Sequence, residues 1–171
     1  MPEATCQPTI ALHHPGHTGT LVDGGWWPCS LDLIAELPPL LTAVEAAGYA
    51  EVRRVSYALT AWDGRPPRKS AMLDRVVKLG GFLSQDPAEI SLVDSSGWKR
   101  IVLVVVPPDT DPTVARRALS MAGMNGDRRR AREILELALL QDSPSAHLRP
   151  SGCVDEMAAA CWDSEGGRVM P

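Results

Sequence analysis

The run Ile101-Val102-Leu103-Val104-Val105-Val106 is the strongest structural signal in the chain. Its six residues are all apolar, and five of them are β-branched. A half-buried strand alternates apolar and polar residues, so an unbroken run predicts a central strand that is covered on both faces. Pro107-Pro108 lacks two backbone donors and ends this strand.

The segments before this run predict further strands. Val52 to Asp63 alternates, with Val55 and Tyr57 on one face. Ser95-Ser96-Gly97 predicts a hairpin turn that leads into a strand over Trp98 to Val106. Gly24-Gly25 is expected to break the regular structure after a strand, and Gly80-Gly81 is expected to end another strand. The remaining predicted strands are Thr9 to Leu12, Thr20 to Asp23, Ala71 to Leu79 and Glu89 to Asp94.

Three helices are predicted between and after the strands. Ser30 is the expected N-cap of the first, whose apolar residues from Leu33 to Val44 recur at helical spacing. Pro38-Pro39 is expected to kink or split it. Asp111 is expected to cap a helix that runs from Pro112 to about Met121, and Asp127 is expected to open a further helix that ends near Gln141.

The order of these elements predicts one α+β domain over residues 1–142. Short connections favour antiparallel neighbours. We therefore expect a curved antiparallel sheet of about six strands, with two to four helices packed mainly on one face. Residues 143–171 are rich in Ser, Gly, Pro and small residues, and this predicts a loosely ordered or disordered C-terminal tail.

Composition limits the partners of this chain of 171 residues. Its formal net charge is −4, which argues against a broad nucleic-acid footprint but leaves room for a local basic patch. Six arginines cluster around the last two helices, where neighbouring acids predict a solvated face: Arg116, Arg117, Arg128, Arg129, Arg130 and Arg132. No signal peptide or membrane span is predicted, so the expected location is the cytoplasm, with Cys6, Cys29, Cys153 and Cys161 as free thiols.

The most unusual segment is Asp23-Gly24-Gly25-Trp26-Trp27-Pro28, in a chain with five tryptophans. Adjacent side chains of an extended segment point to opposite sides, so one indole can fill the core while the other lies at a surface or cleft. One interpretation is a core plug between the sheet and the first helix. The other is an aromatic wall for a cationic or planar ligand. On that hypothesis the candidate ligand-binding residues are Asp23, Trp26, Trp27, Tyr57, Trp62, Asp63, Gln85 and Asp86.

This tryptophan segment, together with several others, resembles one known family. The segments are Val22 to Pro28, then Ser30, Asp32-Leu33 and Glu36-Leu37-Pro38, and further Val55-Ser56-Tyr57, Leu59 to Asp63, Leu79 to Phe82, Ser84 to Pro87 and Val106 to Thr110. The family is an actinobacterial one, catalogued as domain of unknown function 5994, and the resemblance covers residues 9–122. It implies membership but no activity. Relatives typically carry arginines where this chain has Cys29 and Leu31, so an anion site formed by those arginines would be lost here.

No complete catalytic or metal-binding pattern is present. His13-His14-Pro15-Gly16-His17 matches no zinc spacing and predicts a solvated turn. Gly80 to Pro87 lacks the glycine pattern and lysine of a phosphate loop, and no nucleophile elbow occurs. We assign no catalytic residue, metal or cofactor.

The sequence therefore predicts a binding domain for an unidentified small molecule or protein near the tryptophan segment. The alternative is a small hydrolase or isomerase using Asp23 with Asp63 or Asp86. A weaker third idea is contact with nucleic acid through the arginine helices, although the acidic net charge argues against nucleic acid as a partner.

Overall fold

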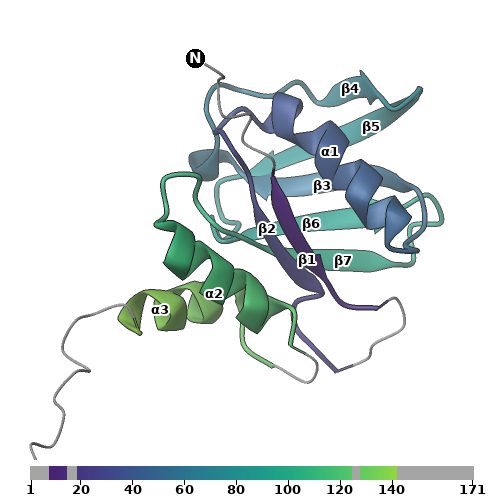
Figure 1. The fold of residues 1–171 in the computed structure, drawn as a ribbon. Coiled ribbons are helices and arrows are strands. Elements are labelled where there is room, and N and C mark those ends of the chain that lie inside the picture. The colour runs from purple at the N-terminus through teal and green to yellow at the C-terminus, as the bar shows by residue number, and fades with distance from the viewer. Residues whose placement is uncertain (1–7, 15–18, 125–127, 142–171) are drawn as a thin grey trace, which may run out of the picture.

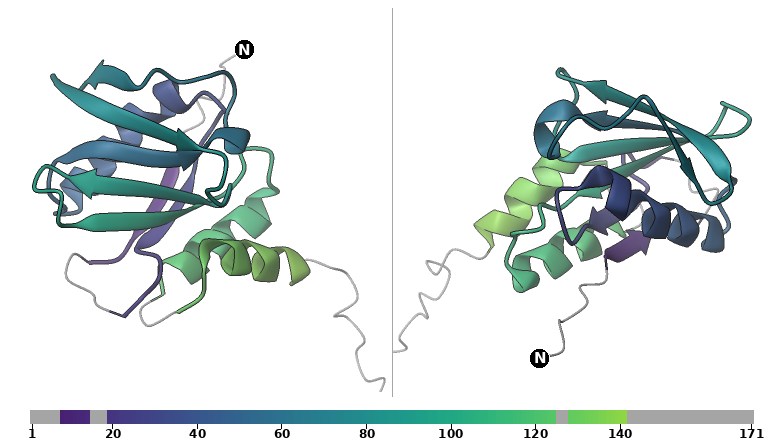
Figure 2. Two further views of the ribbon diagram at one scale, coloured as in Figure 1. Left: turned by 180° about the vertical axis from the view of Figure 1, so that it is seen from behind. Right: turned by 90° about the horizontal axis from the view of Figure 1, so that it is seen from above.

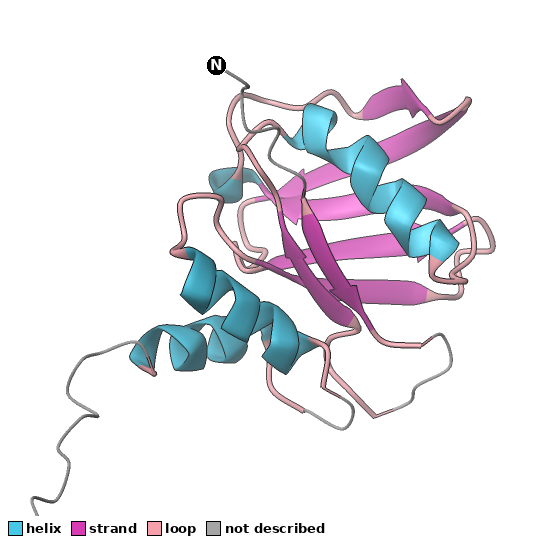
Figure 3. Ribbon diagram, viewed as in Figure 1, coloured by secondary structure: helices cyan, strands magenta, loops and turns pink. Residues whose placement is uncertain are grey.

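A computed structural model describes residues 8–14, 19–124 and 128–141 of the chain. In this part of the chain, three α-helices and a 3₁₀ turn accompany one open seven-stranded sheet (Figures 1 and 3). The strands are β1 (Thr9–Leu12), β2 (Gly24–Trp27), β3 (Val52–Ala58), β4 (Lys69–Met72), β5 (Arg75–Phe82), β6 (Glu89–Asp94) and β7 (Arg100–Val105). The helices are α1 (Leu33–Ala46), α2 (Pro112–Ala122) and α3 (Ala131–Leu140), and the 3₁₀ turn is Leu59–Ala61.

The sheet is mixed, and this corrects the expected antiparallel sheet of six strands. Its order is β1-β2-β7-β6-β3-β5-β4. The pairs β2–β7 and β3–β5 are parallel, whereas the other neighbours are antiparallel. The α+β class is confirmed. Both parallel pairs join strands that are not consecutive in the chain, so the connection lengths did not predict them.

β7 is the central strand that its unbroken apolar run predicts. Leu103 and Val105 pack into the cluster that contains the apolar side of α1. Val104, which points the other way, packs with Ile134 of α3. Burial on both faces removes the polar positions that would otherwise alternate along the strand.

β4 and β5 are two strands where the sequence predicted one. Leu73 and Asp74 form a two-residue turn between them, with φ of 52° and 58°. A two-residue hairpin loop with positive φ at both positions matches the twist of the strands, and Asn-Gly is its usual sequence. Leu-Asp carries no such signal, which is why the turn was missed. β5 also continues through Gly80 and Gly81, which were expected to end it.

α1 is one continuous helix, although Pro38 and Pro39 were expected to kink or split it. Its N-cap is Asp32 rather than the expected Ser30, since Asp32 Oδ1 accepts hydrogen bonds from the N–H groups of Ile34 and Ala35. The prolines lie early in the helix and leave the Ile34 and Ala35 carbonyls without intrahelical donors. Ile34 is half-buried and Ala35 exposed, so water can satisfy these carbonyls.

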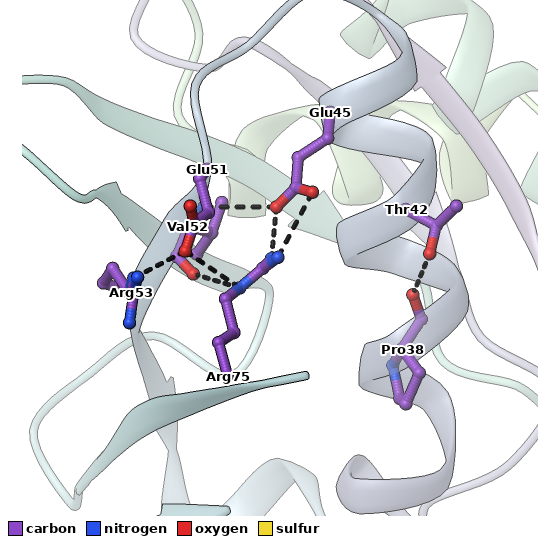
Figure 4. A network of polar contacts seen from close by, with 7 residues as sticks. All are labelled: Pro38, Thr42, Glu45, Glu51, Val52, Arg53 and Arg75. Atoms are coloured by element: carbon purple, nitrogen blue, oxygen red, sulfur yellow. Dashed lines mark hydrogen bonds and ion pairs between the residues drawn. The ribbon is translucent and has the colours of Figure 1, made fainter. Parts of the chain in front are cut away.

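Arg75 fixes the C-terminal end of α1 to the sheet (Figure 4). Its guanidinium forms an ion pair with Glu45 of α1, donates a hydrogen bond of 3.2 Å to the Val52 carbonyl, and lies 3.7 Å from Glu51. Glu45 also accepts a hydrogen bond from the Val52 N–H. The network therefore ties α1, β3 and β5 together at one end of the sheet.

Helices pack on both faces of the sheet rather than mainly on one. α1 covers one face through Leu33, Leu37 and Leu40. α2 and α3 pack against β1, β2 and β7. They leave the face of β6, β3, β5 and β4 that lies opposite α1 without a helix, as the left view of Figure 2 shows.

The glycine pair of the tryptophan segment belongs to β2 and does not break the chain as expected. A Cβ on Gly24 would lie 2.1 Å from the Ala11 carbonyl oxygen. A Cβ on Gly25 would lie 2.9 Å from Leu119 Cδ2 of α2. The two glycines thus permit the close approach of β1 on one side and α2 on the other.

Several predictions fall on residues outside the described part of the chain. They concern the tail at 143–171, Cys6, Cys153, Cys161, His17, and Asp127 as the start of the last helix. Cys29 is disulfide-bonded, so the prediction of a free thiol there is wrong. None of the helices in the described ranges has the length and apolarity that a bilayer-crossing helix needs.

Candidate functional site

Four chain segments meet at one edge of the sheet. β2 ends at Trp27, β7 ends at Val105 and β3 ends at Ala58, and parallel pairing of β2 with β7 brings their carboxyl ends together. β6 runs antiparallel to both β3 and β7, so its first residue, Glu89, lies at the same edge. The carboxyl edge of parallel strands is where open sheets commonly bind ligands.

A pocket of about 360 Å³ lies at this edge. Most of its wall is apolar, and it contains one tryptophan and four prolines. The lining residues are Pro28, Leu31, Ala61, Trp62, Asp86, Pro87, Ala88, Val105, Pro107, Pro108, Arg132 and Leu135. All but the last two come from the four segments that meet at the sheet edge, and Arg132 and Leu135 come from α3.

Trp62 is the aromatic wall of the pocket. Only 7 % of its surface is exposed, and its ring stacks on that of Trp26 with centroids 5.2 Å apart and planes inclined by 25°. Trp26 is fully buried and belongs to the core that includes α1. The buried ring therefore backs the pocket ring and holds it in a single orientation.

The two neighbouring tryptophans of β2 pack on opposite sides of the strand. Trp26 joins the α1 side, whereas Trp27 is half-buried against the cluster that contains Val114 and Ala118 of α2. The indole N–H of Trp27 donates to the Pro107 carbonyl at 3.2 Å. This bond anchors the Pro107-Pro108 wall of the pocket to β2.

The indole N–H of Trp26 has no hydrogen-bond partner among the described residues. An unpaired buried donor costs about 1–3 kcal/mol. The packing of the Trp26 ring on Trp62 and on the surrounding core offsets this cost.

Two charged residues, Asp86 and Arg132, line the pocket. Asp86 Oδ1 accepts a hydrogen bond of 3.0 Å from the Ala88 N–H, and no described residue donates to its other oxygen. Arg132 is paired with Glu136 one turn along α3 at 2.9 Å. The hydrogen bond and charge of Glu136, and then the charge of Asp86, raise the pKa of Arg132. Glu136 does not line the pocket, so the lining itself carries one carboxylate, Asp86, and one guanidinium, Arg132, which is already paired.

The other predicted site residues lie outside the pocket. Tyr57 is buried in the core, which raises the pKa of its phenol. Asp63 is exposed, and its N–H donates to the Leu31 carbonyl at 2.9 Å. Gln85 bridges the carbonyls of Ser56 and Glu89 through its Nε2.

Asp23 lies at the opposite end of β2 from the pocket. Its Oδ2 accepts a hydrogen bond from the Val102 N–H at 2.8 Å, so the carboxylate fastens the start of β2 to β7. Burial raises the pKa of Asp23, while the Val102 N–H and His13 act in the opposite direction. Its part in the structure is therefore to join two strands.

The carboxylates of the alternative enzymatic hypothesis are not brought together. Asp86 borders the pocket, Asp63 is exposed outside it, and Asp23 lies at the far end of β2. Among the described residues, no three His, Cys, Asp or Glu side chains form a group that could hold a metal ion. His13 is buried, and its Nε2 donates to the Ala122 carbonyl at 2.7 Å.

Sequence reasoning found Trp62 and Asp86 but missed most of the wall. Pro28, Pro87, Pro107 and Pro108 were noted only within the segments of the family resemblance and as breakers of regular structure. Pro28 follows β2, Pro107 and Pro108 follow β7, and Pro87 precedes β6, so only the arrangement of these strands in the sheet brings the four prolines into one wall. Leu135 carries no local signal, because its helical periodicity predicts core packing alone.

The chain belongs to a family of unknown function, DUF5994, whose model matches residues 9–122. No curated protein and no solved structure is significantly similar to the chain. Four segments of the resemblance converge on the pocket, through Pro28, Trp62, Pro87 and Pro107. The match ends at the last residue of α2, so the α3 wall lies outside the matched range.

Proposed function

We propose that the protein is a small-ligand-binding domain and that its pocket at the sheet edge accepts a planar, largely apolar molecule with a cationic group. The observation that carries this proposal is a pocket of about 360 Å³ whose wall is apolar and includes Trp62. Ligand pockets are commonly concave, mostly apolar and of this order of size, with a few polar groups at fixed positions.

The planarity of the ligand follows from Trp62. Its ring is fixed from behind by Trp26, so it offers a rigid surface at little entropic cost. A flat aromatic or conjugated molecule makes the largest contact with such a surface. Prolines 28, 87, 107 and 108 add further rigid apolar walls that do not lose rotamer freedom on binding.

The cationic group of the ligand is inferred from Asp86, the one carboxylate in the pocket lining. One Asp86 oxygen accepts no hydrogen bond from a described residue, and Glu136 already pairs with Arg132. A ligand ammonium or amidine beside Asp86 gains a charge-assisted hydrogen bond. Trp62 adds the attraction of an aromatic ring for a cation.

A thermal-shift screen read by tryptophan fluorescence tests this proposal. The panel pairs planar cationic compounds with neutral and anionic analogues of the same shape. A ligand that binds only the folded state raises the midpoint of unfolding by mass action. We expect cationic members to give the largest shifts and to change the tryptophan fluorescence of the protein.

Two variants of α3 form a matched pair for this screen. Leu135→Trp adds bulk to the pocket wall, whereas Leu139→Trp adds the same bulk at a position that is 57 % exposed and outside the pocket. We expect Leu135→Trp to abolish the shifts and Leu139→Trp to keep them, with binding measured by calorimetry.

Asp86→Asn keeps the oxygen that caps Ala88 but removes the charge. We expect it to weaken cationic ligands and leave neutral analogues unchanged. Equal binding of hits to both tryptophan variants would show that the ligand lies elsewhere.

A further inference from the structure

The face of β6, β3, β5 and β4 that lies opposite α1 is a second surface without an assigned role. No described helix covers it (Figure 2, left view). Arg54, Lys78 and Val76 point to this face and are exposed, while the alternating residues Val55, Val77 and Leu79 are buried on the α1 side. We call this surface the open sheet face.

Three cations lie in one row across this face. Lys78 of β5 is paired in register with Arg54 of β3 on one side and with Lys69 of β4 on the other. Directly paired residues project from the same face, with neighbouring strands about 4.8 Å apart. No hydrogen bond or ion pair joins these three side chains to other described residues. The row therefore concentrates positive charge that is not engaged in an ion pair within the described residues.

Two shallow hollows adjoin the row, with volumes of about 660 and 400 Å³. Both are lined by Arg54, Lys69 and Lys78. Together they also include Arg68 and Arg53, of which Arg53 is paired with Glu51 at 2.6 Å, and the one carboxylate among their lining residues is Asp94. Asp94 accepts hydrogen bonds from Ser96 and from the Gly97 and Lys99 N–H groups, so it serves the β6–β7 turn. The surface is thus strongly cationic in a protein whose net charge is −4.

An exposed aromatic ring lies beside the cations. Phe82 is 51 % exposed, and a Cβ on Gly80 would lie only 3.2 Å from its ring, so the ring covers the backbone of Gly80. Phe82 and Gly80 line the same hollow as Lys78. Because Gly80 has no side chain, the ring lies low against the sheet, and its exposed part is available for stacking.

We propose that the open sheet face binds single-stranded nucleic acid, independently of the pocket at the sheet edge. Proteins that bind single strands combine a cationic groove, which follows the phosphates, with aromatic side chains on which bases stack. Sheets whose aromatic residues stack bases are a common form of this surface. The cation row supplies the first element and Phe82 the second. An acidic peptide would use the cations but would gain no stacking on Phe82.

The arginine helices are less suited to this role. Arg117 donates to the Ala138 carbonyl at 2.9 Å and joins α2 to α3, while Arg132 pairs with Glu136. The guanidinium groups of Arg117 and Arg132 are thus engaged within the helices. The local basic surface that the composition allowed lies on strands instead, because cross-strand register gathers cations that are distant in the sequence.

Fluorescence anisotropy of the full chain with labelled oligothymidylate and oligouridylate of about 12 nucleotides tests this proposal. At low salt we expect dissociation constants on the order of 10 μM, and these should increase as the salt concentration rises. The double variant Lys69→Gln/Lys78→Gln should weaken binding about tenfold and reduce the slope of log K against log salt by about 1.4, since each lost phosphate contact contributes about 0.7. Phe82→Leu should weaken binding at least about fivefold.

The matched control is Arg116→Gln/Arg128→Gln, which removes the same charge from the helical region. It should change the affinity less than about twofold, since those residues lie outside both hollows. Polyglutamate should compete poorly at equal charge, because it cannot stack. The proposal is overturned by no binding at low salt, or by equal losses in the two double variants. Effective competition by polyglutamate together with an unaffected Phe82→Leu variant would instead assign the surface to an acidic polypeptide.

Discussion

Lys78→Glu should stabilise the protein while it removes binding at the open sheet face. Lys78 lies between Arg54 and Lys69 in register, so two like-charge pairs cross adjacent strands. Each cross-strand charge pair contributes about 0.2–1 kcal/mol, with the lower part of the range expected for exposed groups. Charge reversal removes two repulsions and adds two attractions. Together these changes should raise the free energy of unfolding by about 1 kcal/mol at low salt.

Urea denaturation at low and at high salt measures this effect. A gain of about 1 kcal/mol corresponds to a rise of about 2–4 °C in the thermal midpoint for a protein of this size. At about 1 M salt the Debye length falls to about 3 Å, so the gain should largely vanish. Arg65→Glu changes the charge equally in an exposed loop and should leave stability nearly unchanged. Unaltered or lower stability of Lys78→Glu at low salt would refute the argument from the cation row.

Three further predictions concern the turns and the pocket. Leu73→Asn/Asp74→Gly should raise the free energy of unfolding by about 1–2 kcal/mol in urea denaturation, because it relieves positive φ at non-glycine residues; a loss would contradict the turn geometry. The Ser96 hydroxyl, and then backbone N–H groups, lower the pKa of Asp94, so its stabilising effect is present above pH 3.8 and is lost as pH falls through the lowered pKa. The free energy of unfolding of Asp94→Asn should therefore be lower than that of the unaltered protein at neutral pH, and acid denaturation should show this difference shrinking below about pH 3.8. A difference that stays constant with pH would exclude this linkage. Leu31→Arg places a cation in the pocket wall and should shift the thermal-shift preference toward anionic planar ligands, whereas an unchanged preference would place Leu31 away from the ligand.

Local patterns predicted most elements of the fold because their causes are local. β1 and β6 have the predicted bounds, and α2 begins at Pro112 after its Asp111 cap, because alternation and capping act over a few residues. The failures also have definite causes. The Leu73-Asp74 turn adopts a backbone that its residue types do not favour. The prolines of α1 are tolerated because the helix is held by its buried leucines.

The candidate site was only partly predictable for the same reason. Trp62 was proposed as a further aromatic side chain of the wall, and Asp86 as a polar residue at a strand end or loop. Asp23 and Gln85 are likewise polar residues at a strand end or loop, yet they bind backbone groups that lie far from them in the sequence. Only pairing between distant strands determines which polar group faces a pocket and which is used in the framework.

The sequence by itself determined the α+β class, the central position of β7 and the opposite packing of the two adjacent tryptophans. These features depend on periodicity and on the geometry of neighbouring residues. Only the tertiary structure decided that β2 pairs in parallel with β7, that four chain segments and α3 enclose one pocket, and that Lys69, Lys78 and Arg54 form a row. Those features depend on contacts between residues far apart in the chain. The free energy that stabilises these contacts comes from burial of the whole hydrophobic core, and no single segment of the sequence determines that burial.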